Sequence, residues 1–261
     1  VLRREGIAAA WGYINGKFLV SLLGGLLPSL FSLAKVMQYL LVAHPLPLWS
    51  FFTGLILGSV IYLLRQNVPQ RAVDKGLLIL GIAIAYGIAI APSATLQGDY
   101  LTMFFAGSIA LCAMILPGIS GSFIMVLLGL YPVFIGAIVN LQFDILAVFA
   151  LGGLIGLMAF SRLLSWLLDH YQAAVIATMC GFLIGSLNII WPWKQVIETT
   201  SSRSGKTMVL APENLLPNQF SVTGQDPQTA ACLMAFFFAL ILVLGLEYIG
   251  KKYAEKPVPA E

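Results

Sequence analysis

The sequence predicts an all-α polytopic membrane protein, built as an inverted-topology repeat of about six transmembrane helices with a re-entrant helical hairpin. Three observations carry this prediction: 59% of the 261 residues are hydrophobic and only 10% are charged, long uncharged stretches alternate with short polar ones, and one segment resembles another at a spacing of 127 residues. Soluble globular proteins carry roughly 25% charged residues, so the composition excludes that class. A net charge of +3 without a basic run longer than two residues also excludes a nucleic-acid partner and favours membrane lipids.

The predicted spans are apolar segments bounded by charge or proline. A helix needs about 20 apolar residues to cross a hydrocarbon layer of roughly 30 Å. Six segments come near this length: Phe18–Leu41, Leu46–Leu64, Gly76–Ala91, Ile145–Leu168, Ala173–Trp191 and Thr229–Ile249. The three cysteines fall inside apolar runs and act as small hydrophobic residues, so we expect no metal site, no disulfide framework and no cofactor.

A hairpin is predicted between the third and fourth spans. Residues Tyr100–Phe143 are uncharged and are interrupted by Pro117, Gly118, Ile119, Ser120, Gly121 and Ser122. The arms Leu101–Leu116 and Phe123–Tyr131 reach only about 24 Å and about 14 Å at 1.5 Å per residue. This favours a re-entrant hairpin. The alternative, two ordinary helices joined by a tight turn, requires the second arm to continue through Pro132.

The positive residues predict the orientation. Nine lysines and arginines fall on one side when the six spans alternate: Arg3, Arg4, Lys17, Arg65, Arg71, Lys75, Lys251, Lys252 and Lys256. Three fall on the other side, all within the polar loop at 192–228. The positive-inside rule makes the first side cytoplasmic. We therefore expect a multi-pass protein of the cell inner (cytoplasmic) membrane, with both ends of this chain cytoplasmic and the loop extracytoplasmic.

The repeat predicts one transmembrane domain in two halves, at about 1–96 and about 100–250. A spacing of 127 places Gly54 and Gly58 on Gly181 and Gly185, and it places Lys35 on Arg162. The copies are separated by an odd number of crossings, so the second copy is inverted. Inverted repeats are typical of transporters in which two halves build one site by alternating access.

The same spacing makes a prediction about the chain before Val1. Subtracting 127 from the Pro117–Ser122 position gives about residue −10. We therefore expect an upstream segment that carries a partner hairpin rich in glycine, serine and proline and enters from the cytoplasm. With this upstream hairpin, each half of the repeat would contain one hairpin.

The hairpin tip has the chemistry of an anion site. Proline and glycine end the first half-helix, and Ser120 and Ser122 are suited to cap the second half-helix. Unpaired backbone N–H groups and the positive end of the helix dipole would then face the membrane interior, where they bind anions such as phosphate. The alternative is a kink or a close-packing site without a ligand.

Three further residues are candidates for substrate binding. Arg162 lies within an apolar helix and is suited to a bidentate phosphate contact, or it reaches to the cytoplasmic interface. Lys35 mirrors it near the outer face, with the same two alternatives. Asn188 is a weaker candidate, because a single asparagine usually makes a packing hydrogen bond between helices. The small residues Gly152, Gly153 and Gly156 offer a face for close helix contact, including contact between copies of a homo-oligomer.

Several of these segments together resemble one bacterial family. They are LPGISGSFIMVLLGLY, SRLLSWLLDHY, GFLIGS with WPWK, and the opening LRREGIAAAW, within about Leu2 to Lys194. They are similar to the polyprenyl-phosphate transporters, formerly a membrane family of unknown function. The resemblance implies transport of undecaprenyl phosphate, the carrier lipid of envelope polysaccharide synthesis, back across the membrane for reuse. That family has two glycine-rich hairpins of the PGxSGG type. This chain shows only the second, with Ser122 in place of the last glycine.

Other functions are less consistent with the sequence. Gly118–Gly121 also matches the GxSG of intramembrane serine proteases, but His44 and His170 lie at span ends and cannot reach Ser120. No cluster of histidine, arginine and aspartate suits a lipid phosphatase, and we predict no catalytic residue. Ser204–Thr207 resembles the end of a P-loop without the required glycine or preceding strand. A secondary transporter of a small anion would share the repeat and the hairpin. A purely structural subunit would tolerate changes at the hairpin tip.

Overall fold

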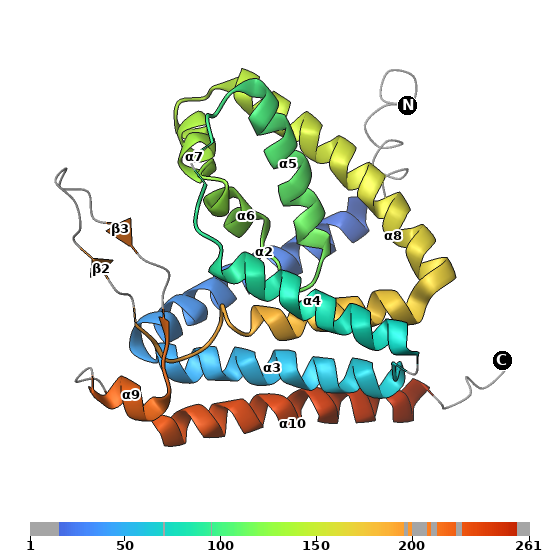
Figure 1. Ribbon diagram of the computed structural model, residues 1–261, viewed down its shortest axis with the longest axis vertical. Helices are drawn as coiled ribbons and strands as arrows, with labels where there is room; N and C mark the ends of the chain where they lie inside the picture. Colours follow the sequence, from blue (N-terminus) through green and yellow to red (C-terminus); the bar gives the residue numbers. More distant parts are fainter. Residues whose placement is uncertain are drawn as a thin grey trace.

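The computed structural model describes residues 16–69, 71–94, 96–195, 198–199, 208–209, 213–222 and 226–254. The predicted upstream hairpin and the residues Arg3 and Arg4 lie outside this part of the chain. The longer helices are α2 (Gly16–Ala43), α3 (Pro45–Gln66), α4 (Ala72–Ile90), α5 (Tyr100–Ile115), α8 (Phe143–Ser186) and α10 (Thr229–Ala254). The short elements are α6 (Gly121–Leu127), α7 (Tyr131–Val139), α9 (Pro217–Val222), and two-residue strands β1 (Lys194–Gln195), β2 (Glu198–Thr199), β3 (Met208–Val209) and β4 (Glu213–Asn214) (Figure 1).

The six predicted spans are all helical. Five helices in the described residues are long and apolar enough to cross a membrane, or six if α6 and α7 count as one span. This confirms an all-α polytopic membrane protein. One predicted boundary is wrong, since the fifth span ends at Ser186 instead of Trp191. The fourth and fifth spans are the two arms of α8. The backbone between them is not helical at Tyr171 (φ −136°, ψ 41°), so the predicted break between Leu168 and Ala173 is confirmed.

Two pairs of helices lie side by side in one layer: α3 with α10, and α4 with the arm of α8 after the bend (Figure 1). Glycines set both contacts. A Cβ atom on Gly54 would overlap the carbonyl oxygen of Phe236, and one on Gly181 would overlap that of Leu78. One turn further on, Gly58 faces Val243 and Gly185 faces Ala85. Backbones therefore approach closely along both pairs, as small residues allow in membrane helices.

The arm of α8 before the bend packs on α5. Gly152, Gly153 and Gly156 face Phe104, Leu111 and Ser108 of α5. The close helix contact expected at these glycines is therefore confirmed, and α5 of the same chain is the helix that they contact. The Tyr100 hydroxyl donates a hydrogen bond of 2.6 Å to Asp144 across the start of the two helices.

The second arm of the predicted hairpin is shorter than expected. Instead of running from Phe123 to Tyr131, it ends at Leu127, and α7 then leaves at an angle of 110°. Gly129 has a left-handed φ of 72°, and the Leu130 amide donates to the Met125 carbonyl, so the chain turns sharply here. Pro132 lies in the first turn of α7, where proline is well tolerated because that N–H has no helical acceptor.

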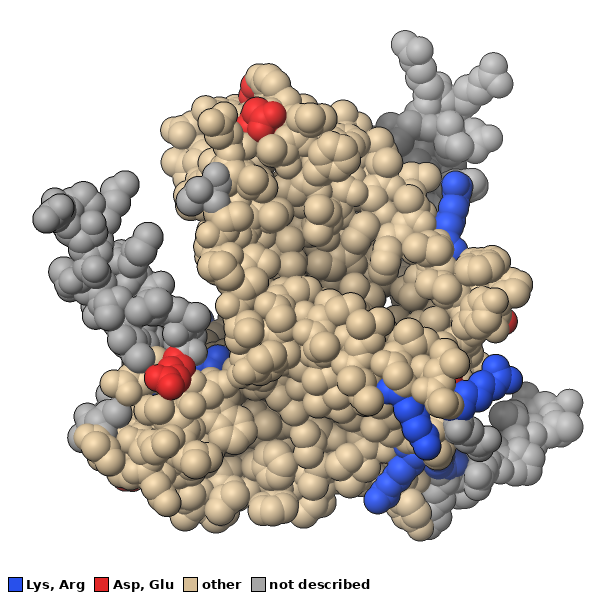
Figure 2. Space-filling view, viewed as in Figure 1, with Lys and Arg blue, Asp and Glu red and all other residues tan. Residues whose placement is uncertain are grey.

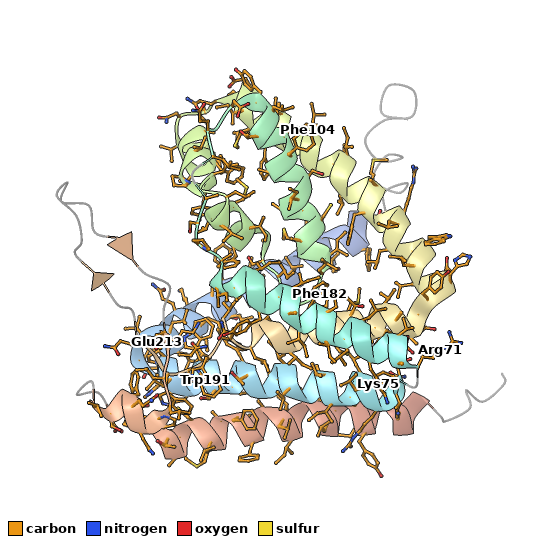
Figure 3. All side chains as sticks on the ribbon, in the orientation of Figure 1. Arg71, Lys75, Phe104, Phe182, Trp191 and Glu213 are labelled. Carbon is orange, nitrogen blue, oxygen red and sulfur yellow. The ribbon has the colours of Figure 1, made fainter. Side chains whose placement is uncertain are left out.

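The polar loop and the main group of cations lie at opposite ends of the α3–α4 layer. Arg71 and Lys75 are at one end, and Trp191 and Glu213 are at the other (Figure 3). Figure 2 shows most of the visible lysines and arginines on the Arg71 side of the molecule. Lys251, from the last helix, lies 5.5 Å from the centre of the Tyr62 ring. The Trp193 indole donates a 2.9 Å hydrogen bond to the Pro227 carbonyl, so the loop is tied to the start of α10.

Candidate functional site

The Pro117–Ser120 segment forms a tight loop between α5 and α6. Helix α5 ends at Ile115, and the Ile119 amide makes a 3.4 Å hydrogen bond to the Leu116 carbonyl across the turn. Gly118 has φ +86°, a left-handed conformation that costs any other L-residue roughly 1–2 kcal/mol. The interruption predicted from proline and glycine is therefore present, and glycine is required at its turning point.

The loop lies directly against the end of α8. A Cβ atom on Gly118 would be 2.8 Å from the Ser186 hydroxyl oxygen and 3.1 Å from the Phe182 carbonyl oxygen. Ser186 is buried, and its hydroxyl donates to the Leu183 carbonyl within its own helix. Figure 3 places Phe182 near the middle of the molecule, beside α4. The hairpin tip thus contacts an interior helix of the protein.

The start of α6 exposes backbone donors. Ser120 is at the N-cap position with extended backbone (φ −95°, ψ 130°), but its side chain makes no capping hydrogen bond, contrary to the prediction. Instead the hydroxyls of Ser120 and Ser122 bond to each other at 2.8 Å. The backbone N–H groups of residues 120–123 have no hydrogen-bond acceptor within the described part of the chain. These groups can bind an anion.

Gly121 and Ser122 lie between α5 and a small cavity. Gly121 packs on the Ala110 carbonyl of α5, and its own Cβ position is filled by the side chain of Met114. Ser122 lines a cavity of about 190 Å³, whose other walls are apolar residues of α5, α7 and α8. This cavity is apolar throughout, so the serine hydroxyls and the free N–H groups do not open into it.

The three other predicted site residues do not contact the hairpin tip. Arg162 on α8 and Lys35 on α2 are exposed, and neither has a hydrogen bond or an ion pair within the described residues. Asn188 accepts a hydrogen bond from the Asn214 side chain, so its amide holds the polar loop to the end of α8. Lys194 nearby donates to the Ile189 carbonyl, and burial lowers the pKa of its ammonium group.

Comparison with known proteins decides the family. A family model described as undecaprenyl phosphate translocase-like matches residues 1–208. This chain belongs to the undecaprenyl phosphate translocase-like family. It is 44% identical over 258 residues to a polyprenyl-phosphate transporter of Vibrio cholerae, covering 98% of this chain and 82% of that protein. It is 35% identical over 193 residues to a polyprenyl-phosphate transporter of Staphylococcus aureus, covering 67% of this chain and 68% of that protein. No solved structure matches it.

Sequence reasoning missed the partner surface of the hairpin in this undecaprenyl phosphate translocase-like chain. Ser186 and Phe182 meet Gly118, although they follow it by more than sixty positions in the sequence. The available signal was the GFLIGS segment, Gly181–Ser186, which takes part both in the repeat and in the family resemblance. Its small residues indicate that another backbone approaches closely there.

Proposed function

We propose that this chain moves undecaprenyl phosphate, or a related polyprenyl phosphate, across the cytoplasmic membrane without changing it chemically. The observation that carries the proposal is its family membership, with 44% identity to a polyprenyl-phosphate transporter over nearly the whole chain. Such a lipid has an anionic phosphate head and a long apolar tail. The apolar helices and the hairpin donors suit these two parts respectively.

In this proposal, the Pro117–Ser122 segment binds the phosphate. Free N–H groups at the start of α6 are the donors, and Gly118 and Gly121 let this segment pack closely on α8 and α5. Contacts with the phosphate as the lipid moves to or from this site come from Arg162, Lys35 and Asn188. Arg162 and Lys35 are exposed on long helices, which suits an encounter with a lipid that arrives from the bilayer.

The transport mechanism proposed is alternating access between two inverted halves. The helix contacts support this reading. The spacing of 127 makes α3 the counterpart of the second arm of α8. In an inverted repeat, α4 would then be the counterpart of α10. The contact of α3 with α10 would therefore correspond to the contact of the second arm of α8 with α4. Both pairs occur, and matching glycines face matching positions in them.

The register of these contacts is also consistent. Gly54 and Gly58 face Ala239 and Val243, while their counterparts Gly181 and Gly185 face Gly81 and Ala85. The partners in the two pairs differ by the same 158 positions, from Gly81 to Ala239 and from Ala85 to Val243. Figure 1 shows α3 and α10 running in one direction and α4 with the second arm of α8 in the other. Two inverted halves would have this arrangement.

The orientation proposed places Arg71 and Lys75 in the cytoplasm and the polar loop outside. The closeness of Lys251 to Tyr62 supports a common side for the end of α10 and the α3–α4 connection. Both ends of this chain would then be cytoplasmic.

The test is transport in liposomes that contain the purified protein and labelled undecaprenyl phosphate. We expect Gly118→Leu, Gly121→Leu and Arg162→Ala to abolish flux while the protein still inserts. Gly245→Leu is the matched control, because nothing lies within 4 Å of that Cβ position. Unchanged flux in all three variants would refute the hairpin site. Flux of labelled inorganic phosphate in place of the lipid would favour a small-anion transporter.

A further inference from the structure

Two adjoining cavities lie where the start of α4 meets the bend of α8. One has a volume of about 480 Å³ and is lined by polar residues that include Arg71, Asp74, His170 and Gln172. The other has a volume of about 460 Å³ and is almost entirely apolar. Val73, Tyr171 and Ala174 line both cavities, so the two are continuous there. Each volume is within the range of roughly 300–1,000 Å³ that is typical of ligand pockets.

The polar cavity lies at the positive ends of two helices. Helix α4 and the second arm of α8 run in the same direction, since Gly81 faces Gly181 and Ala85 faces Gly185. The arm has its own start because the backbone is not helical at Tyr171. Both first turns therefore face this cavity, and the dipoles of both helices favour an anion in it. The Arg71 side chain adds hydrogen-bond donors of the kind that bind phosphate. The His170 ring lines the wall beside it and makes a 2.9 Å hydrogen bond from Nδ1 to the Trp166 carbonyl.

Asp74 is a buried acidic residue in the wall of the same cavity. Its side chain is only 6% exposed, and it has no hydrogen bond or ion pair within the described residues. Its carboxylate oxygens are not among the buried atoms that lack a partner in the described residues, so they face the cavity and any ligand that binds there. Beside a bound phosphate, an ionised Asp74 repels each further negative charge. It would therefore disfavour a diphosphate more than a monophosphate.

The apolar cavity extends from the polar cavity to the hairpin. Its walls include Leu77 of α4 and Phe160 and Leu164 of the first arm of α8. At its far end are Leu116, directly before the Pro117 loop, and Phe182, whose carbonyl faces Gly118. A polar compartment joined to an apolar groove matches a molecule with a charged head and a hydrocarbon tail.

We infer that these two cavities form one binding site for a polyprenyl monophosphate on the Arg71 side of the protein. The phosphate lies beside Arg71 and His170, the first prenyl units lie in the apolar groove, and Asp74 selects against the diphosphate. The inference rests on the proposed function and extends it, because it assigns the lipid a second binding site that is distinct from the hairpin tip.

The test is equilibrium binding of labelled undecaprenyl phosphate to the protein in nanodiscs. Arg71→Ala is expected to raise the dissociation constant at least about tenfold, because hydrogen bonds to charged groups are among the strongest in proteins. His170→Ala and Ala174→Trp, which fills the junction of the two cavities, are expected to weaken binding as well. Arg65→Ala and Ala147→Trp are the matched controls, because both residues are exposed and line neither cavity. Asp74→Asn is expected to improve binding of undecaprenyl diphosphate more than that of the monophosphate.

The results of the binding and transport measurements test this site independently of the proposed function. If the wild type transports the lipid while Arg71→Ala and Ala174→Trp bind it as their controls do, the site is refuted and the function stands. If the wild type neither binds nor transports the lipid, both are refuted. Partial recovery of binding with Arg71→Lys, together with an unchanged unfolding temperature of each variant, would show that lost binding reflects the phosphate contact and not a misfolded protein.

Discussion

Gly81 of α4 and Gly181 of α8 meet backbone to backbone: a Cβ atom on Gly181 would lie 3.0 Å from the Gly81 Cα atom. The Thr178 and Leu78 carbonyls lie on either side of the contact, so neither glycine has room for a methyl group. This crossing holds together the helices that form the polar cavity and present Ser186 to the hairpin. The geometry of this crossing therefore affects both proposed binding sites for the lipid.

Gly181→Ala is expected to destabilise the protein by roughly 1–3 kcal/mol, because the added methyl group forces the two helices apart. The measurement is thermal unfolding of the purified protein in detergent. Gly87→Ala, in α4, is the control: nothing lies within 4 Å of that position, and alanine favours a helix over glycine by roughly 1 kcal/mol. Equal unfolding temperatures for the two variants would contradict the close crossing.

Gly118→Ala tests the conformation of the hairpin loop. The substitution brings a methyl group to 2.8 Å from the Ser186 hydroxyl oxygen and leaves alanine with φ +86°. We expect lower stability and slower lipid transport. Adding Ser186→Gly removes the collision but not the left-handed backbone, so it should restore only part of the loss. Complete recovery in the double variant would mean that the backbone conformation carries no cost. Gly136→Ala, in α7 with nothing within 4 Å, is the control.

The sequence predicted the parts of this fold that depend on local composition. Apolar length located the spans, and Pro117 with Gly118 located the break between α5 and α6, because neither residue continues a helix well. Pro132 was misleading, since it suggested a limit to the hairpin arm but starts a helix instead. The break between the fourth and fifth spans was predicted at 169–172, and the non-helical residue Tyr171 lies within it.

The site was harder to predict because it depends on which distant helices cross. Nothing near Gly118 in the sequence indicates that Ser186 lies against it. Asp74 was not predicted as a site residue, because an acidic residue in the first turn of a helix normally interacts with the helix dipole in solvent. Only the packing of α4 on α8 buries it. Asn188 was predicted as a weaker substrate-binding candidate, with a hydrogen bond between helices as the alternative. In the structure its side chain accepts a hydrogen bond from Asn214 of the loop.

The pair Asn188 and Asn214 separates a structural role from a role in transport. If Asn188 holds the loop through Asn214, alanine at either position should loosen the same part of the chain. Hydrogen exchange of residues around Trp193 would then rise equally in both variants, and a double-mutant cycle would give a coupling energy of roughly 0.5–3 kcal/mol. Slower lipid flux with Asn188→Ala but not with Asn214→Ala would instead support a direct contact with the substrate.

Lys194 is expected to make stability depend on pH in the alkaline range. Burial lowers the pKa of its ammonium group from the ordinary 10.5, so the folded protein releases this proton before the unfolded chain does. Between the lowered pKa and 10.5 the unfolded state binds more protons, and the stability of the folded state therefore rises with pH. Lys194→Gln lacks this contribution. The unfolding temperature of the wild type relative to Lys194→Gln should therefore increase as the pH rises toward 10.5. Parallel curves for the wild type and Lys194→Gln would show that the Lys194 ammonium group is not held in a desolvated position by the Ile189 carbonyl and the surrounding loop.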